Sequence, residues 1–236
     1  MKIQCVWEHN GDDSILYSSN FIGAFTRGRS KDEAIQKMPS EIISYLKWKG
    51  SLAPNALEPE IIQEKVSELT ICDADSDVLF DEEKTPLTLA EYEQLKALAM
   101  KSAHDFLTLY QVIPDKNKSA LPIRATFYGE IPRTANEMYE HTKNVNSYYF
   151  SEIGVQADNN GTIEECRKHG FELLEQQPDF LENKVYLGSY DEEWSLRKVL
   201  RRFIWHDRIH AKAMYRMALK TFGAGAVPDV FFFSAH

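Results

Sequence analysis

The sequence contains little cysteine and no long apolar segment. Its three cysteines, Cys5, Cys72 and Cys166, are widely spaced and form no CxxC pair, which argues against a disulfide framework and a thiolate metal site. We expect each to be a small buried apolar side chain in a reducing compartment. No segment approaches the roughly 18 consecutive apolar residues of a membrane span, and the N-terminus has no apolar signal core. The prediction is a cytoplasmic protein without a membrane partner.

Positive charge is also scarce, especially in the first third of the chain. The net charge is −9, and residues 1–84 contribute −7 of it, with nine Lys and Arg against sixteen Asp and Glu. Such an acidic region repels phosphate backbones, so we expect no nucleic-acid partner. The chain has no GxSxG or GxxxxGK(S/T) motif and no Ser-His-Asp or Cys-His arrangement, so its chemistry must be sought elsewhere.

What the chain does contain is enough apolar material for a two-domain α+β protein. It has 236 residues, of which 43% are hydrophobic and 12% aromatic. The period of the apolar pattern changes from strand-like to helical at the charged segment DEEKTPLT (81–88). We therefore predict one domain at 1–82 and a second at 83–236.

The first domain shows strand periodicity near its start. Ile3, Cys5 and Trp7 alternate on one face, and SILYSSNFIGAFTRG (14–28) supplies one or two further strands. After a Pro-containing loop, VSELTICDADSDVLF (66–80) is predicted to be a returning strand or hairpin.

A helix is predicted between these strands. Ser30, with Glu33 three residues later, forms a capping box, and Pro39 should kink or split the helix. The resulting β-β-β-α-β order, with the segment GAFTRGRSKDEAIQKM, resembles the HicB-like fold of antitoxins over about the first 80 residues. The resemblance implies a fold and no activity, because the DNA-binding segment that commonly follows in that family has no counterpart here.

The second domain is predicted to be helical. Thr134 with Glu137 and Thr162 with Glu165 form two further capping boxes, and Gly223 closes the last helix. The predicted helices cover about 88–111, 134–152, 162–177 and 194–222. Four amphipathic helices with one long connection indicate an up-and-down four-helix bundle.

Three histidines lie on the apolar stripes of two of these helices. His206 and His210 are one turn apart within a stripe of the last helix that comprises Leu196, Val199, Phe203, His206, His210, Ala213 and Met217. His141 lies in the stripe Met138, His141, Val145 and Tyr148 of the second helix. We therefore expect all three imidazoles to face the core.

Three inward imidazoles need partners, because burying polar nitrogens without them costs roughly 1–3 kcal/mol each. One divalent ion satisfies all three and leaves coordination positions open, as in catalytic sites. Other metal motifs do not fit: Asp207 replaces the catalytic Glu of the zincin HExxH motif, and the Glu-x-x-His pairs of di-iron bundles are missing. The other histidines, at 9, 104, 169 and 236, are expected at the surface or rim.

The triad and its helical context resemble the DinB/YfiT-like superfamily. The matching segments are TANEMYEHTKNVNSYYF, with His141, and WSLRKVLRRFIWHDRIHAKAMYR, with His206 and His210, within a match over roughly residues 85–222. The resemblance implies one divalent transition metal such as zinc or nickel, and a homodimer. Its characterised members are mostly thiol-dependent transferases and isomerases, which implies activation of water or of a low-molecular-weight thiol against a small-molecule substrate.

Four residues near the triad are considered for supporting roles. Tyr148 and Tyr149 are candidate donors to a substrate oxygen, although packing is favoured for both. Glu140 and Asp207 adjoin ligands in sequence but point away from them. The eight basic residues of 194–222 are expected to form a solvated flank or to pair with the acidic N-terminal domain, and the Phe-rich tail to dock on its own bundle or on a second protomer.

The leading hypothesis is a metal-dependent transferase or hydrolase that acts on a small molecule. The alternative is a non-catalytic stress or regulatory protein in which the histidines hold a structural ion or form a hydrogen-bonded cluster. A metal in an open pocket favours the first hypothesis, and a closed or metal-free core favours the second.

Overall fold

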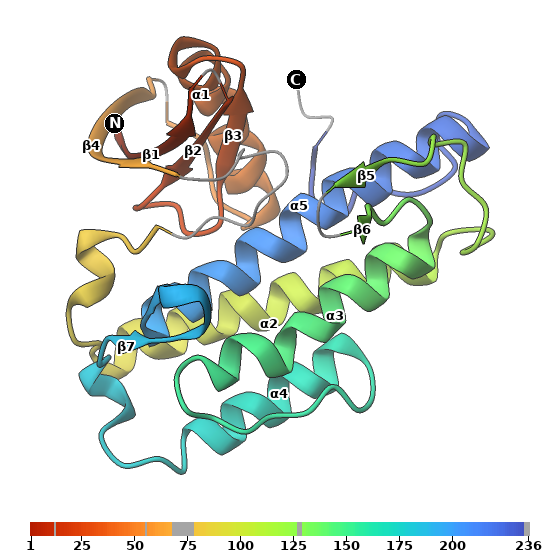
Figure 1. Ribbon diagram of the computed structural model, residues 1–236. Helices are drawn as coiled ribbons and strands as arrows, with labels where there is room; N and C mark the ends of the chain where they lie inside the picture. Colours follow the sequence, from red (N-terminus) through yellow and green to blue (C-terminus); the bar gives the residue numbers. More distant parts are fainter. Residues whose placement is uncertain (12, 55, 68–77, 127–128, 234–236) are drawn as a thin grey trace. The chain divides into compact units, whose positions relative to one another are not determined.

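The computed structural model describes residues 1–236 apart from 12, 55, 68–77, 127–128 and 234–236 (Figure 1). The protein is α+β, with a small mixed sheet near the N-terminus and five α-helices among the described residues. The chain forms two compact units, one comprising Met1–Glu83 with Phe231–His236 and the other Lys84–Val230. Within the described part of the chain, no helix has the length and apolar character needed to cross a membrane.

The first unit contains a four-stranded sheet in the order β3-β2-β1-β4. Strands β1 and β2 pair antiparallel, as do β2 and β3, whereas β1 and β4 are parallel. The elements are β1 (Lys2–Asn10), β2 (Asp13–Ser18), β3 (Phe25–Gly28), α1 (Lys31–Trp48) and β4 (Glu58–Val66). Their order, β-β-β-α-β, is the one predicted from the sequence.

Two details of this unit differ from the prediction. Of the kink or split predicted at Pro39, the split is absent: helix α1 continues through Pro39, with a capped start and buried side chains on both sides. Strand β4 begins at Glu58, inside the segment predicted as a loop, and its side chains are mostly exposed or half-buried, so its apolar signal is weak. Most of the predicted strand at 66–80 lies outside the described residues.

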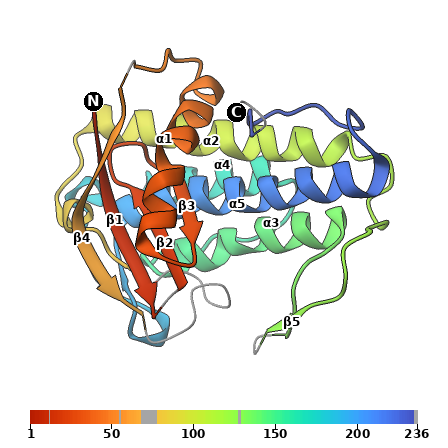
Figure 2. The ribbon, with the colours of Figure 1, turned by 90° about the horizontal axis from the view of Figure 1, so that it is seen from above.

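The second unit is built from four helices that begin within two residues of their predicted starts. They are α2 (Leu89–Gln111), α3 (Ala135–Ser151), α4 (Ile163–Leu174) and α5 (Leu196–Phe222). Thr88, Thr134 and Thr162 form complete capping boxes with the Glu three residues later. Helix α2 packs against α5 and α4, and α3 packs against the same two helices. Figure 2 shows α2, α5 and α3 running side by side.

Short elements that were not predicted precede and connect these helices. The two hairpins are β5–β6 (Ala125–Thr126 with Gly129–Glu130) and β7–β8 (Tyr186–Leu187 with Glu193–Trp194). The 3-10 helices are η1 (Asp81–Lys84), η2 (Phe180–Glu182) and η3 (Ser189–Asp191). Strands of two residues leave too little periodicity in the sequence to be recognised.

Helix α5 is buried on nearly every side along its first half. Of the predicted apolar stripe, Leu196, Val199, Phe203, His206 and Met217 are buried, whereas His210 and Ala213 are half-buried. Four basic residues that were predicted to form a solvated flank or to pair with the acidic N-terminal domain are also buried: Lys198, Arg201, Arg202 and Arg208. For these four the prediction of a solvated flank was wrong. Aromatic rings explain part of the burial, because the Arg202 guanidinium lies over Tyr149, Trp194 and Trp205 at 5.0–5.5 Å from the ring centroids.

The C-terminal tail belongs to the first unit, although it was predicted to dock on the helices of residues 83–236 or on a second protomer. The Phe231 ring stacks on Trp48 of α1, with centroids 5.4 Å apart, and Phe233 stacks on Phe231. The Ser44 hydroxyl donates a 2.8 Å hydrogen bond to the Phe232 carbonyl. Apolar burial of Phe231 therefore holds this part of the tail against α1.

Candidate metal centre

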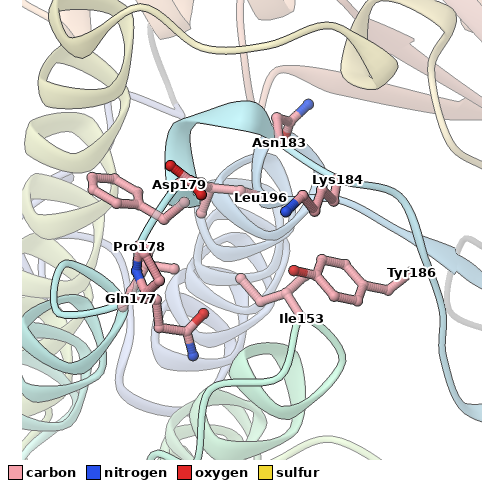
Figure 3. Close-up of a pocket in the computed structure, with 10 residues that line it drawn as sticks. Ile153, Gln177, Pro178, Asp179, Asn183, Lys184, Tyr186 and Leu196 are labelled. Carbon is pink, nitrogen blue, oxygen red and sulfur yellow. The ribbon is translucent and has the colours of Figure 1, made fainter.

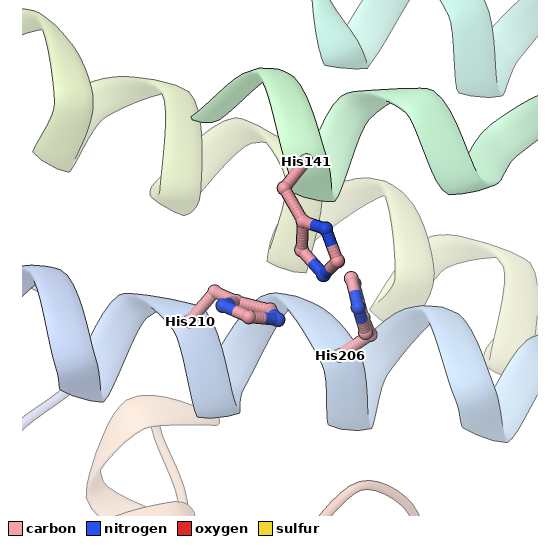
Figure 4. A group of neighbouring side chains, drawn as sticks. All are labelled: His141, His206 and His210. Atoms are coloured by element: carbon pink, nitrogen blue, oxygen red, sulfur yellow. The ribbon is translucent and has the colours of Figure 1, made fainter. Parts of the chain in front are cut away.

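His141, His206 and His210 converge on one point between α3 and α5 (Figure 4). Each offers one ring nitrogen, and these three nitrogens all lie within 4.8 Å of one another. The ring centroids are 5.1 Å apart for His141 and His206, and 4.6 Å apart for His141 and His210. The sequence therefore predicted correctly which histidines meet, because positions i and i+4 of a helix share one face.

His206 is the deepest of the three. It is 1% exposed, and among the described residues neither of its ring nitrogens has a hydrogen-bond partner. Burial, reinforced by His210 and His141, lowers its pKa well below the ordinary value, so the ring is neutral. A buried imidazole with two unsatisfied nitrogens is destabilising unless something binds it. The donor set therefore fits a borderline metal ion, for which neutral imidazole is a common ligand.

The other two histidines are progressively nearer to solvent. His210 is half-buried and His141 is exposed. The prediction that His141 faces the core was therefore wrong. The buried stripe of α3 runs one position away, through Met138, Thr142 and Tyr149, and places His141 at the edge of the helix face. The centre is closed on the α5 side and open at His141.

Aromatic side chains line the closed side. Tyr149 is fully buried, and its ring centroid is 6.0 Å from that of His206 and 5.4 Å from that of Phe203. The Tyr148 ring packs against Tyr149 and Trp194, at 5.5 and 5.8 Å. Both tyrosines therefore contribute to packing, and Tyr149 also forms part of the wall beside His206.

A buried ion pair lies next to His206 in sequence. The Arg167 guanidinium on α4 donates two hydrogen bonds to the Asp207 carboxylate, at 2.7 and 3.1 Å, and both side chains are 0% exposed. Burial raises the pKa of Asp207, while Arg167 opposes this. Glu140, the other acid beside a ligand, forms a 2.9 Å ion pair with Lys143. Sequence reasoning missed Arg167, whose position inside the apolar stripe of α4 was the available signal.

None of the other described histidines and cysteines belongs to the triad. His104 and His169 are exposed near Glu164 and Glu172, and His9 stacks on Trp7. His236 lies outside the described residues. Cys5 and Cys166 are buried free thiols, and burial raises the pKa of Cys5 to about 12. Cys72 lies outside the described residues.

A separate depression lies beside η2 (Figure 3). It encloses about 340 Å³ of space that includes open solvent. Its lining includes Gln177, Asn183, Lys184 and Tyr186, and none of the three histidines. The Asn183 side chain is already used, because its amide donates to the Thr85 carbonyl and its oxygen accepts from the Arg197 backbone. The Asn183 amide in this depression therefore has a structural role.

Comparisons with protein-family models, with curated proteins and with solved structures gave no match. The geometry of the triad is therefore the observation on which a functional proposal depends.

Proposed function

We propose that helices α2–α5 form a four-helix bundle of the DinB/YfiT-like kind, which holds one divalent transition metal, zinc or nickel, through His141, His206 and His210. In this proposal the protein is a metal-dependent transferase or hydrolase that acts on a small molecule, with a low-molecular-weight thiol as its co-substrate. It is a cytoplasmic homodimer, and its first unit is a HicB-like domain.

The observation that carries the proposal is the buried His206 ring, neither of whose nitrogens has a hydrogen-bond partner among the described residues, so that its lone pair is available to a metal ion. Natural proteins rarely leave such groups unpaired, and exceptions are concentrated at functional sites. His210 and His141 supply two further nitrogens within 4.8 Å. A metal ion binds nitrogen lone pairs from three residues at once, which a single N–H or O–H group does not do.

The chain's own residues define how a reactant reaches this centre. His206 and His210 are fixed on one helix, while exposed His141 lies on the solvent side, where a small molecule can approach. The Tyr149, Phe203 and Trp194 cluster excludes water from the opposite side. Half-buried Tyr148 is the candidate donor to a substrate oxygen. The chemistry supplied by a bound divalent ion is Lewis-acid activation of water or thiol.

The test is elemental analysis of protein purified without a chelator or a histidine tag. We expect about one transition-metal ion per chain in the wild type and none in His206→Ala. His169→Ala is the matched control, because this histidine is exposed on α4 and should leave the metal content unchanged. Metal-loaded protein would then be screened for transfer of a thiol to electrophilic small molecules.

Absence of metal from wild type and variant alike, after reconstitution with zinc and nickel, would refute the proposal. The non-catalytic interaction protein would then be the better hypothesis. Metal in the wild type without any thiol transfer or hydrolysis would retain the metal centre and refute the enzymatic part.

A further inference from the structure

We infer that Arg167 and Asp207 are positioning residues for the metal centre, and that their buried ion pair fixes the rotation of α5 on which His206 and His210 depend. The inference rests on the proposed function, because it requires that the triad binds a metal. It goes beyond that function by assigning a role to two residues that are not ligands.

The geometry of the Arg167–Asp207 pair restricts the orientation of both side chains. Two hydrogen bonds, at 2.7 and 3.1 Å, join the planar guanidinium to both oxygens of Asp207. Bidentate pairing restricts the orientation of both groups, which a single contact would not do. Since Asp207 directly follows His206 on α5, any rotation of the helix that breaks the pair also turns His206 away from the triad.

Arg167 also connects this part of α5 to other helices. Its guanidinium donates to the Ala99 carbonyl of α2 at 3.4 Å, and it lies 4.0 Å from the centroid of the Phe203 ring. Phe203 is one turn before Asp207 on α5 and packs against Phe150 of α3 at 5.2 Å. One guanidinium from α4 therefore contacts both α2 and the turn of α5 that contains His206.

Stability alone does not explain such a pair. Burying two charges removes their hydration, and apolar side chains of similar volume in their place are often as stable or more so. What an apolar pair does not provide is a fixed angle, because dispersion contacts have little directionality. The ion pair is therefore expected to matter for ligand direction more than for folding.

The experiment compares zinc binding by wild type and by Arg167→Met/Asp207→Leu, which removes both charges and retains apolar volume. Affinity is measured by competition with a chromophoric chelator, and geometry by the absorption spectrum of the Co²⁺-loaded protein. We expect zinc affinity to fall by about tenfold or more and the Co²⁺ spectrum to change. The urea unfolding midpoint of the metal-free protein should stay at or above that of the wild type.

The matched control is Lys96→Met/Glu175→Gln, which removes a partly exposed ion pair between α2 and the end of α4. It should leave zinc affinity and the Co²⁺ spectrum unchanged. Arg167→Lys replaces the apolar double variant in the experiment if that variant does not fold. It retains the charge, loses the bidentate fork, and should weaken zinc binding measurably.

Wild-type affinity and an unchanged Co²⁺ spectrum in the double variant, or in Arg167→Lys if the double variant is unfolded, would overturn the inference while the metal centre stands. Loss of zinc binding by the control as well would overturn it too, because the effect would then be a general loss of helix packing. Failure of the wild type itself to bind zinc or Co²⁺ would instead refute the proposed function.

Discussion

The rings of His206 and His210 lie 4.4 Å apart, at an interplanar angle of 62°, one turn apart on α5. The backbone of one helix therefore presents two imidazole rings in the same direction without help from any loop. Only the third donor, His141, depends on how α3 packs against α5. Two of the three side chains of the centre are therefore placed by the geometry of a single helix.

The first prediction concerns His206→Leu in metal-free protein. Because the variant removes two buried nitrogens without partners, we expect the free energy of unfolding to increase by about 1–2 kcal/mol in the presence of a chelator. Urea denaturation measures this. Zinc should raise the unfolding midpoint of the wild type and leave that of the variant unchanged. A variant less stable than the metal-free wild type would contradict the conclusion that the His206 nitrogens are unsatisfied without metal.

The second prediction concerns close packing of α4 on α3. A Cβ placed on Gly170 would lie 2.1 Å from the Phe150 ring, so Gly170→Ala must displace a fully buried side chain. We expect a loss of about 1–3 kcal/mol in unfolding free energy, although alanine is the better helix former. Gly170→Ala/Phe150→Leu should recover part of the loss, and an additive effect of the two substitutions would argue against direct contact.

The third prediction concerns the cap of α4. The Thr162 hydroxyl accepts a hydrogen bond from the Glu165 backbone, and the Glu165 carboxylate accepts one from the Thr162 backbone. Thr162→Ala should lower the unfolding free energy by about 1 kcal/mol, and Thr162→Ser should retain most of it. Chemical denaturation gives the unfolding free energy of each variant and so distinguishes the effect of the hydroxyl from that of the methyl group. Equal losses of unfolding free energy in the two variants would exclude the capping explanation.

The fourth prediction concerns pH. Burial lowers the pKa of Lys198 to about 8, against the opposing effect of Glu192. The folded protein then releases this proton at lower pH than the unfolded chain, whose lysine keeps the ordinary pKa of 10.5. The cost of burying the charge is present below pH 8 and is relieved as the pH rises.

The measurement for Lys198 is the difference in unfolding free energy between the wild type and Lys198→Met at several pH values. We expect this difference to move in favour of the wild type by about 2 kcal/mol between about pH 7.5 and pH 10. A difference that stays constant, or moves in favour of the variant, would show that Lys198 does not change its charge in this interval.

Features that depend on short stretches of chain were predictable from the sequence. The starts of α3 and α4 follow from Thr134 and Thr162, since a capping box needs only residues within one turn. The pairing of His206 with His210 follows from the helical repeat alone. Their meeting with His141 follows from the packing of α3 on α5, with His141 exposed beside the buried face of α3.

Features that depend on distant residues were not predictable. Arg167 and Asp207 are forty positions apart, and nothing in either neighbourhood indicates the other. The exposure of His141 is set by the exact rotation of α3. An apolar stripe in the sequence indicates which face of a helix a residue lies on, but not whether it lies at the centre or the edge of that face. The burial of Lys198 and Arg202 depends on Trp194, from a two-residue strand that has no periodicity of its own.

The gradient of exposure from His206 through His210 to His141 has a kinetic consequence. Because the outermost of the three rings is exposed, an ion held by them could leave by release of His141 first and of the other two rings afterwards, without separation of the helices. Chelators should therefore strip the protein at a rate that is independent of the rate of global unfolding. In closed structural sites, by contrast, metal loss and unfolding are one event.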